Sequence, residues 1–268
     1  MIGDSLYDLL VHIQVWGAMV LLFAIRPAVC FMVLPATDEP AMTATIRHLL
    51  GVVFAIHVAA GASPADFITA ATPQGLITMA LREALIGFTI GFAAGQGFWI
   101  AQSVGALVDN LAGFNNVQLI NPSSSEQSTP VSDTLLQMFI AVFWASGGML
   151  VLLGVMGQTY LWWPVLDATP QWPRFPEAFA EIQLSHLART TVSLAMPILF
   201  LLAFVDVGLG MVSRAAKNVD TSPLGTPLKS AIAMLSMVLF SSVFLADIRQ
   251  YLSLADLPAM VAKWHSMR

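Results

Sequence analysis

Residues 82–113 read REALIGFTIGFAAGQGFWIAQSVGALVDNLAG, and residues 114–133 then turn polar as FNNVQLINPSSSEQSTPVSD. Gly87, Gly91 and Gly95 stand four residues apart, so they lie in one row on a helix. Glycine in such a row lets a second helix approach closely. At ~1.5 Å per residue, the apolar part is longer than the ~30 Å hydrocarbon core of a bilayer. The stretch therefore predicts a long transmembrane helix packed tightly against another helix, followed by a polar loop.

The composition of the chain is typical of a polytopic membrane protein. Apolar residues make up 57% and charged residues 10% of its 268 residues, against about 45–50% and about 25% in soluble domains. The net charge is −5 and no basic cluster is present, so nucleic acid is not expected as a partner. The single cysteine, Cys30, excludes an internal disulfide and a thiolate metal cluster.

The motifs of common enzyme and cofactor sites are missing from the sequence. It contains no H-E-x-x-H, no Walker A motif, no dinucleotide-binding glycine fingerprint and no G-x-S-x-G elbow. The five histidines are scattered, without metal-ligand spacing. The sequence therefore offers no candidate catalytic residues, no cofactor-binding motif and no metal site.

Six apolar segments are long enough for helices, and none alternates as a barrel strand would. The chain is thus predicted to be all-α and polytopic, with a single domain over residues 1–268. Pro27 disfavours helical geometry at Arg26, so a kink or break is expected inside the first segment. The predicted apolar helices cover about residues 9–34, 46–61, 76–113, 134–156, 187–212 and 228–250, and a polar loop covers residues 114–133.

Charges near the ends of these segments do not decide the membrane orientation. Of 11 Lys and Arg residues, five fall on one side of six simple spans and six on the other, so the positive-inside rule gives no answer. This balance suggests helices held by partner proteins as much as by lipid. Arg214, Lys217 and Lys229 form a basic linker that is expected on the cytoplasmic side, near lipid headgroups or an acidic partner, with a solvated turn that obeys the positive-inside rule as the alternative. Asp206 lies eight residues before Arg214, and we interpret the two as a buried charge pair, with a functional role for Asp206 as the alternative.

Several stretches, taken in order, carry a resemblance to a known family. They are Arg26 through Pro35 to Arg47, Glu83 with Gly87 and Gly91, Gly105 and Asp109 before Asn121-Pro122, Gly147-Gly148, Tyr160 to Pro164, Pro197-Ile198 through Leu209-Gly210 to Arg214, and Pro227-Leu228-Lys229. Over about residues 10–250, this set resembles the T subunit of the bacterial type III secretion export gate, the SctT family, which is related to flagellar FliR. Lys217 stands where flagellar members tend to have Pro, and residues 218–220 also depart from the flagellar pattern. These departures favour the virulence or symbiosis branch, the injectisome.

The resemblance implies a non-enzymatic, structural subunit of a protein-export channel in the bacterial inner membrane. Family members join R and S subunits in a cone-like hetero-oligomer, with helices packed as hairpins and much of the assembly raised above the bilayer on the periplasmic side. The implied partners are these R and S subunits, the export-switch (U) subunit, the translocating unfolded protein and membrane lipid. The loop after the long central helix is thought to help plug the channel. In this chain that segment would be residues 114–130, with candidate pore residues Phe114, Val117, Leu119, Ile120, Asn121 and Pro122.

A small-molecule transporter is the competing interpretation. Broken helices near the intramembrane Asp206 would suit one, whereas the missing internal repeat and the small number of spans do not. Copurification distinguishes the two, because an export-gate subunit should bring down other membrane proteins at fixed stoichiometry.

Overall fold

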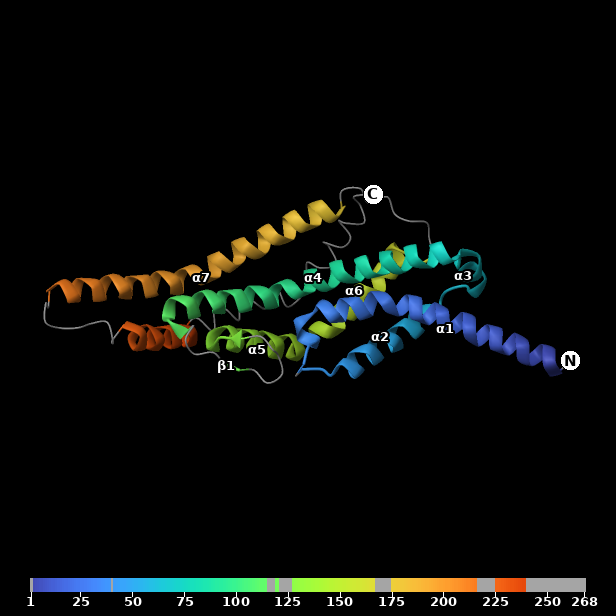
Figure 1. Cartoon of the computed structure of the whole chain (residues 1–268), viewed down its shortest axis with the longest axis horizontal. Helices are drawn as coiled ribbons and strands as arrows, with labels where there is room; N and C mark the ends of the chain where they lie inside the picture. The colour runs from blue at the N-terminus through green and yellow to red at the C-terminus, as the bar shows by residue number, and fades with distance from the viewer. Residues whose placement is uncertain are drawn as a thin grey trace. The chain divides into compact units, whose positions relative to one another are not determined.

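The structure is a computed structural model, and it describes residues 2–39, 41–114, 119–120, 127–166, 175–215 and 225–239. Helices dominate these ranges, so the predicted all-α fold class is confirmed. A helix without a label, Gly225–Leu239, follows the last labelled one and is called the 225–239 helix. The labelled elements of Figure 1 are α1 (Ile2–Val33), η1 (Pro35–Thr37), α2 (Ala44–Ala59), α3 (Pro64–Ala70), α4 (Pro73–Ala112), β1 (Leu119–Ile120), β2 (Gln127–Ser128), α5 (Pro130–Ala145), α6 (Gly148–Trp162) and α7 (Phe175–Ala215).

Three of the described helices, α1, α4 and α7, are long and apolar enough to cross a membrane. The count rises to five if α2 with α3, and α5 with α6, each form one broken span. α2 and α3 meet at a bend of 106°. The predicted count of six is therefore approximate, and the predicted continuation of the last helix to residue 250 lies outside the described residues.

Internal contacts divide the chain into two compact units. The first comprises the described residues of Met1–Gly95 and Met149–Phe175, and the second those of Gln96–Gly148 and Pro176–Ala255. The apolar pattern, from which one domain was predicted, does not reveal this division. The boundary between Gly95 and Gln96 falls inside α4, whose 40 residues form one helix with its only proline at the first position.

In the first unit, α1 packs against α2 and α3, which lie beside it in Figure 1. Apolar side chains of α1, α4 and α6 are fully or almost fully buried there. In a membrane, close packing of this kind holds helices together, because lipid tails are as apolar as the side chains themselves. The buried set includes Met19, Phe31, Ile86, Ile90, Leu152 and Met156.

In the second unit, three aromatic rings connect α4 with α5. The centroid of the Phe98 ring lies 4.5 Å from that of Phe139 and 5.4 Å from that of Phe143, both edge-to-face. Pairs in this geometry contribute about 0.5–1.5 kcal/mol each. Gly97 makes room for the contact, because a Cβ there would collide with the Phe139 ring. The rings therefore fix how α5 packs along the second part of α4.

The prediction of one helix over residues 134–156 is wrong. α5 ends at Ala145 and α6 begins at Gly148. Gly147 has a φ of +75°, which glycine adopts at little cost and other residues rarely adopt. Gly148 lies against the Phe143 ring, so a side chain there would have no room. The two glycines therefore end one helix and begin the next.

The polar loop, the start of α5 and the start of α7 also differ from the prediction. β1 pairs antiparallel with β2, with Leu119 opposite Ser128 and Ile120 opposite Gln127, so part of the loop has regular structure. α5 already begins at Pro130 and α7 at Phe175. Proline near the start of a helix is favourable, because its missing N–H would have no partner there.

Candidate functional site

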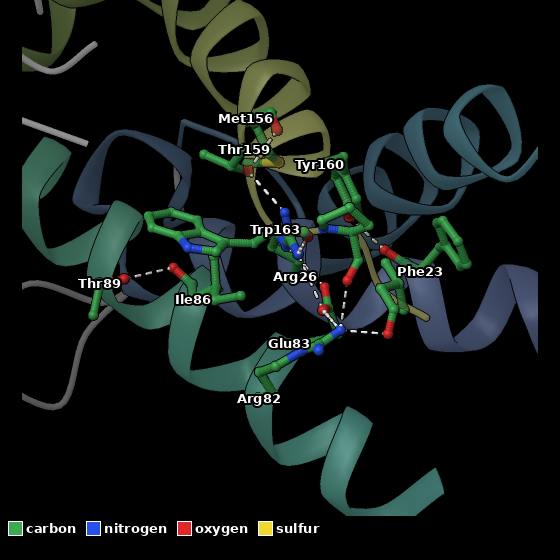
Figure 2. A network of polar contacts seen from close by, with 12 residues as sticks. Phe23, Arg26, Arg82, Glu83, Ile86, Thr89, Met156, Thr159, Tyr160 and Trp163 are labelled. Atoms are coloured by element: carbon green, nitrogen blue, oxygen red, sulfur yellow. Dashed lines mark hydrogen bonds and ion pairs between the residues drawn. The ribbon is translucent and has the colours of Figure 1, made fainter. Parts of the chain in front are cut away.

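A buried charge network joins α1, α4 and α6 in the first unit. Arg26 of α1 and Glu83 of α4 are both fully buried. The guanidinium donates two hydrogen bonds to the carboxylate, from Nε to Oε2 at 2.8 Å and from Nη2 to Oε1 at 3.0 Å. Figure 2 shows Arg26 between this carboxylate and the residues of α6. This geometry is the strong, bidentate form of an arginine–carboxylate pair. The pairing explains why an arginine is tolerated in an apolar helix.

The same guanidinium also binds the end of α6. Its Nη1 donates to the Thr159 hydroxyl at 2.9 Å and its Nη2 to the Trp163 carbonyl oxygen at 2.9 Å. The Thr159 hydroxyl donates in turn to Met156 O at 2.7 Å. The last carbonyl groups of a helix lack partners within it and carry partial negative charge. Arg26 therefore satisfies the C-terminal end of α6 as well as Glu83.

Arg82 adds a second cation to this network. It is 6% exposed and lies 3.4 Å from Glu83 Oε1. Its Nη2 donates to Pro164 O at 2.8 Å and also to Val165 O. Two guanidinium groups thus lie against one carboxylate, and backbone carbonyl groups after α6 accept hydrogen bonds from both of them. The network fixes the turn that follows α6 onto α1 and α4.

Tyr160 accounts for the continuity of α1 through Pro27: of the kink or break expected there, the break does not occur. Pro27 has no N–H, so Phe23, four residues earlier, loses the usual partner of its carbonyl oxygen. The Tyr160 hydroxyl donates to that oxygen at 2.7 Å. Its ring also stacks on Phe23 and lies 3.9 Å below the Arg26 guanidinium, a favourable cation–π contact. A side chain from α6 therefore replaces the missing bond of α1.

The glycine row of α4 brings α1 close enough for the network to form. A Cβ on Gly87 would collide with the Arg26 carbonyl oxygen and lie 3.1 Å from Arg26 Cα. A Cβ on Gly91 would lie 2.7 Å from Cys30 O and 3.0 Å from Cys30 Cα. Gly95 is buried further along the helix. Because Glu83 precedes Gly87 by one turn, the close contact at Gly87 places its carboxylate at Arg26.

In the second unit, Asp109 caps the helix that follows the polar loop. Its carboxylate is fully buried. Oδ2 accepts a hydrogen bond from Ser132 N at 2.9 Å, and Oδ1 accepts one from Val131 N at 3.2 Å. The local N-cap, Thr129, makes no capping bond of its own. A negative charge at this position also interacts favourably with the helix dipole, so α4 supplies the cap that α5 lacks.

Gly105 and Ser132 complete the attachment of α5 to α4. A Cβ on Gly105 would lie 2.6 Å from Ser132 N, so only glycine allows this approach. The Ser132 hydroxyl donates to Gln102 O at 2.9 Å. Gly105 and Asp109 are one turn apart on α4, and both contact the first turn of α5. The downstream end of the polar loop is therefore fixed to α4.

The upstream end of the loop leaves α4 at Gly113. This glycine has a φ of +82° and donates its N–H to Asp109 O at 3.1 Å, as in a left-handed helix C-cap. A Cβ there would lie 3.1 Å from Thr226 Cγ2 on the 225–239 helix. The Ser230 hydroxyl of that helix lies 3.5 Å from Ala112 O. The 225–239 helix thus contacts the end of α4.

The candidate pore residues are described only in part. Phe114 is half-buried directly after Gly113. Leu119 and Ile120 form β1. Val117, Asn121 and Pro122 lie outside the described residues. The structure therefore gives the two attachment points of the loop and the β1–β2 pairing between them.

The predicted buried pair of Asp206 with Arg214 needs correction. Lys229 Nζ lies 3.0 Å from Asp206 Oδ1, and the Asp206 side chain is 48% exposed. Arg214 is exposed near the end of α7, and Lys217 lies outside the described residues. A spacing of eight residues turns about 80° around a helix, so Lys229, from the neighbouring helix, is better placed than Arg214.

The partner of Arg26 was not predicted from the sequence, although the charges of the two residues give a signal for the pair. Arg26 and Glu83 are opposite charges deep inside two different apolar segments, where an isolated charge is costly. Pairing them by sign would have suggested the contact. Within the described ranges, no three His, Cys, Asp or Glu side chains gather so that they could hold a metal ion. The network around Arg26 and Glu83 and the cap made by Asp109 both attach helices to one another through fixed charges and hydrogen bonds.

A family of known proteins and several individual relatives match most of the chain. The family described as bacterial export proteins, family 1, matches residues 18–255 of the chain. The chain is 29% identical to Yop proteins translocation protein T of Yersinia pestis, over 79% of this chain and 81% of that protein. It is 26% identical to the surface presentation of antigens protein SpaR of Salmonella typhimurium, over 83% and 82% of the two chains. It is also 26% identical to the flagellar biosynthetic protein FliR of Bacillus subtilis, over 90% and 93%.

Proposed function

Because the chain belongs to family 1 of the bacterial export proteins, we propose that it is a subunit of the export apparatus of a bacterial type III secretion system. The observation that carries this proposal is the family match, which extends over residues 18–255. Lys217 and residues 218–220, which depart from the flagellar pattern, support the injectisome branch. The subunit is a multi-pass protein of the inner membrane, and its role is structural: it forms part of the conduit for unfolded proteins.

The exposed face of α7 supports a role inside a larger assembly. Only 17% of its apolar span is buried, against 39% for the spans of α1 and α4. Large side chains follow one another along this face at three- and four-residue spacing, which places them on one stripe of the helix. We propose that R and S subunits cover part of this face, in a cone that rises above the bilayer on the periplasmic side, and that the U subunit binds the same assembly. The stripe consists of Met196, Phe200, Phe204, Val207 and Met211, which are between 56% and 74% exposed.

Copurification tests the assignment. The full chain, tagged at one end and expressed with its chromosomal neighbours, is solubilised in mild detergent and purified. We expect other membrane proteins to copurify at fixed stoichiometry and to remain bound through gel filtration. A chain that purifies alone, and still supports uptake of a small solute, would favour the transporter interpretation instead.

We also propose that residues 114–130 plug the conduit. The attachment of both ends supports this, because Gly113 and the Asp109 cap hold the loop at two fixed points of α4. Eight Ser, Thr and Asn residues between Asn115 and Thr129 can bind water or one another, and apolar residues between them can exclude water from a narrow passage. A plug also has to open at low free energy, as the least stable parts of a protein do.

The plug is tested by deleting residues 117–120 in the assembled complex. We expect normal copurification of the partners but a raised leak of small ions across the membrane. A matched variant replaces the same four residues with serine and keeps the loop length, so it separates apolar bulk from length. Background conductance in both variants, together with unchanged export, would show that the loop is only a connector.

A further inference from the structure

The Asp206–Lys229 ion pair lies beside the place where the polar loop leaves α4. Lys229 belongs to the first turns of the 225–239 helix, and Asp206 to α7. Thr226 and Ser230, on the same turns as Lys229, are the residues of this helix that approach Gly113 and Ala112. The ion pair therefore joins to α7 the same turns of the 225–239 helix that contact the end of α4.

The contact at Gly113 constrains the backbone where it leaves α4. A side chain at Gly113 would meet Thr226, so the helix closes the space on that side of the turn. The Ser230 hydroxyl donates to Thr226 O at 2.8 Å and lies within reach of Ala112 O. If the helix moved away, the turn at Gly113 and the last carbonyl groups of α4 would lose these neighbours.

The pair is built to hold weakly. The Asp206 side chain is 48% exposed and that of Lys229 is 19% exposed. Ion pairs with this exposure contribute little and separate easily, in contrast with the fully buried pair of Arg26 and Glu83.

We propose that the Asp206–Lys229 pair is a releasable latch, which holds the first turns of the 225–239 helix against the Gly113 end of α4. The effect of this latch on export rests on the proposed function, in which the latch controls one attachment point of the plug. The latch itself depends only on the contacts among α4, α7 and the 225–239 helix.

Disulfide trapping measures the latch directly. A Cβ at Gly113 would lie 3.9 Å from Thr226 Cβ, within the ~3.5–4.5 Å that a disulfide requires. The double variant Gly113→Cys and Thr226→Cys is therefore made in the full chain in membranes, with Cys30→Ala and the single-cysteine variants as controls. All charge variants carry Gly113→Cys, so the strain of a side chain at the positive φ of that position is the same in each of them.

Charge variants are then tested in this background. Asp206→Lys or Lys229→Asp alone should slow disulfide formation about two- to five-fold, as expected for a weak ion pair. The exchange of both charges in one chain should restore the original rate. Equal rates in all variants, or a double variant that stays slow, would overturn the latch.

Two further measurements keep the outcomes distinct. Asp206→Asn replaces Asp206→Lys if the latter lowers the amount of chain in the membrane, and it should still slow disulfide formation. Copurification is followed in parallel. Failure of the parent chain to bind partners would refute the proposed function, whereas the disulfide rates within the chain alone decide the latch.

Discussion

Replacement of Glu83 by Gln tests whether the buried network holds the first unit together. The substitution keeps the size of the side chain and one acceptor oxygen but removes the charge. Two guanidinium groups, of Arg26 and Arg82, would then lie buried without a counter-ion. Removal of one partner from a buried pair costs about 3–5 kcal/mol. Since Arg26 keeps its bonds to Thr159 and the Trp163 carbonyl, we expect the lower end, about 3 kcal/mol.

This loss is large enough to measure by thermal unfolding. A change of 1 kcal/mol shifts Tm by roughly 2–4 °C in a chain of about this size, so we expect Tm to fall by roughly 6–12 °C. Tryptophan fluorescence of the purified complex in detergent reports the transition. Asp38→Asn is the matched control, because Asp38 pairs with Arg47 at 2.8 Å but is 58% exposed. We expect that variant to lose less than about 1 kcal/mol.

The double variant Arg26→Met and Glu83→Leu distinguishes the cost of an unpaired buried charge from the loss of the contact between the two side chains. It removes the charges of Arg26 and Glu83 and keeps apolar volume, and such replacements are often neutral or stabilising. Arg82 keeps its hydrogen bonds to the carbonyl groups after α6. We therefore expect it to be more stable than Glu83→Gln alone. If the double variant is the less stable one, or if Glu83→Gln unfolds at the temperature of the parent protein, the carboxylate does not act as a buried counter-ion and the reasoning fails.

Three more substitutions test the remaining contacts. Tyr160→Phe should leave Phe23 O without a partner and lower the free energy of unfolding by about 1–3 kcal/mol, measured by the same thermal assay; an unchanged Tm would contradict the replacement of the missing bond. Gly91→Leu should reduce the yield of copurified complex sharply, because its Cβ would meet Cys30 O at 2.7 Å, whereas Gly154→Ala, with no atom within 4 Å of its Cβ, should not. Asp109→Asn should cost about 1–2 kcal/mol, since an amide oxygen replaces a charged cap, and proteolysis near the start of α5 should become faster; equal proteolysis of both proteins would count against the cap.

Much of the fold could be predicted from hydrophobic content, but the contacts between helices could not. Apolar length is a property of one segment, and it placed both ends of α4 to within three residues, whereas α1 begins seven and α7 twelve residues before the predicted start. The division of residues 134–156 into α5 and α6 depends on the positive φ at Gly147. Glycine pairs also occur inside straight membrane helices, so Gly147-Gly148 alone did not decide between a turn and a packing site.

The site shows the same limit more clearly. Local spacing suggested Arg214 as the partner of Asp206, yet Lys229 from the next helix binds it. The cost of a charge in lipid indicates that Arg26 faces protein or water, but it does not indicate which residue binds it, and that partner lies 57 residues away in the sequence. Periodicity describes which face of a helix is apolar. It contains no information on which other helix covers that face.

The bond between Tyr160 and Phe23 has a consequence for how this sequence can change over evolutionary time. The tyrosine hydroxyl is needed at this place because Pro27 provides no N–H. A chain with alanine at position 27 would satisfy Phe23 O within α1 and would tolerate phenylalanine at position 160. A chain that keeps Pro27 would not. The two positions are therefore expected to covary, with the hydroxyl lost only after the proline, so that the order of the two substitutions matters as much as their identity.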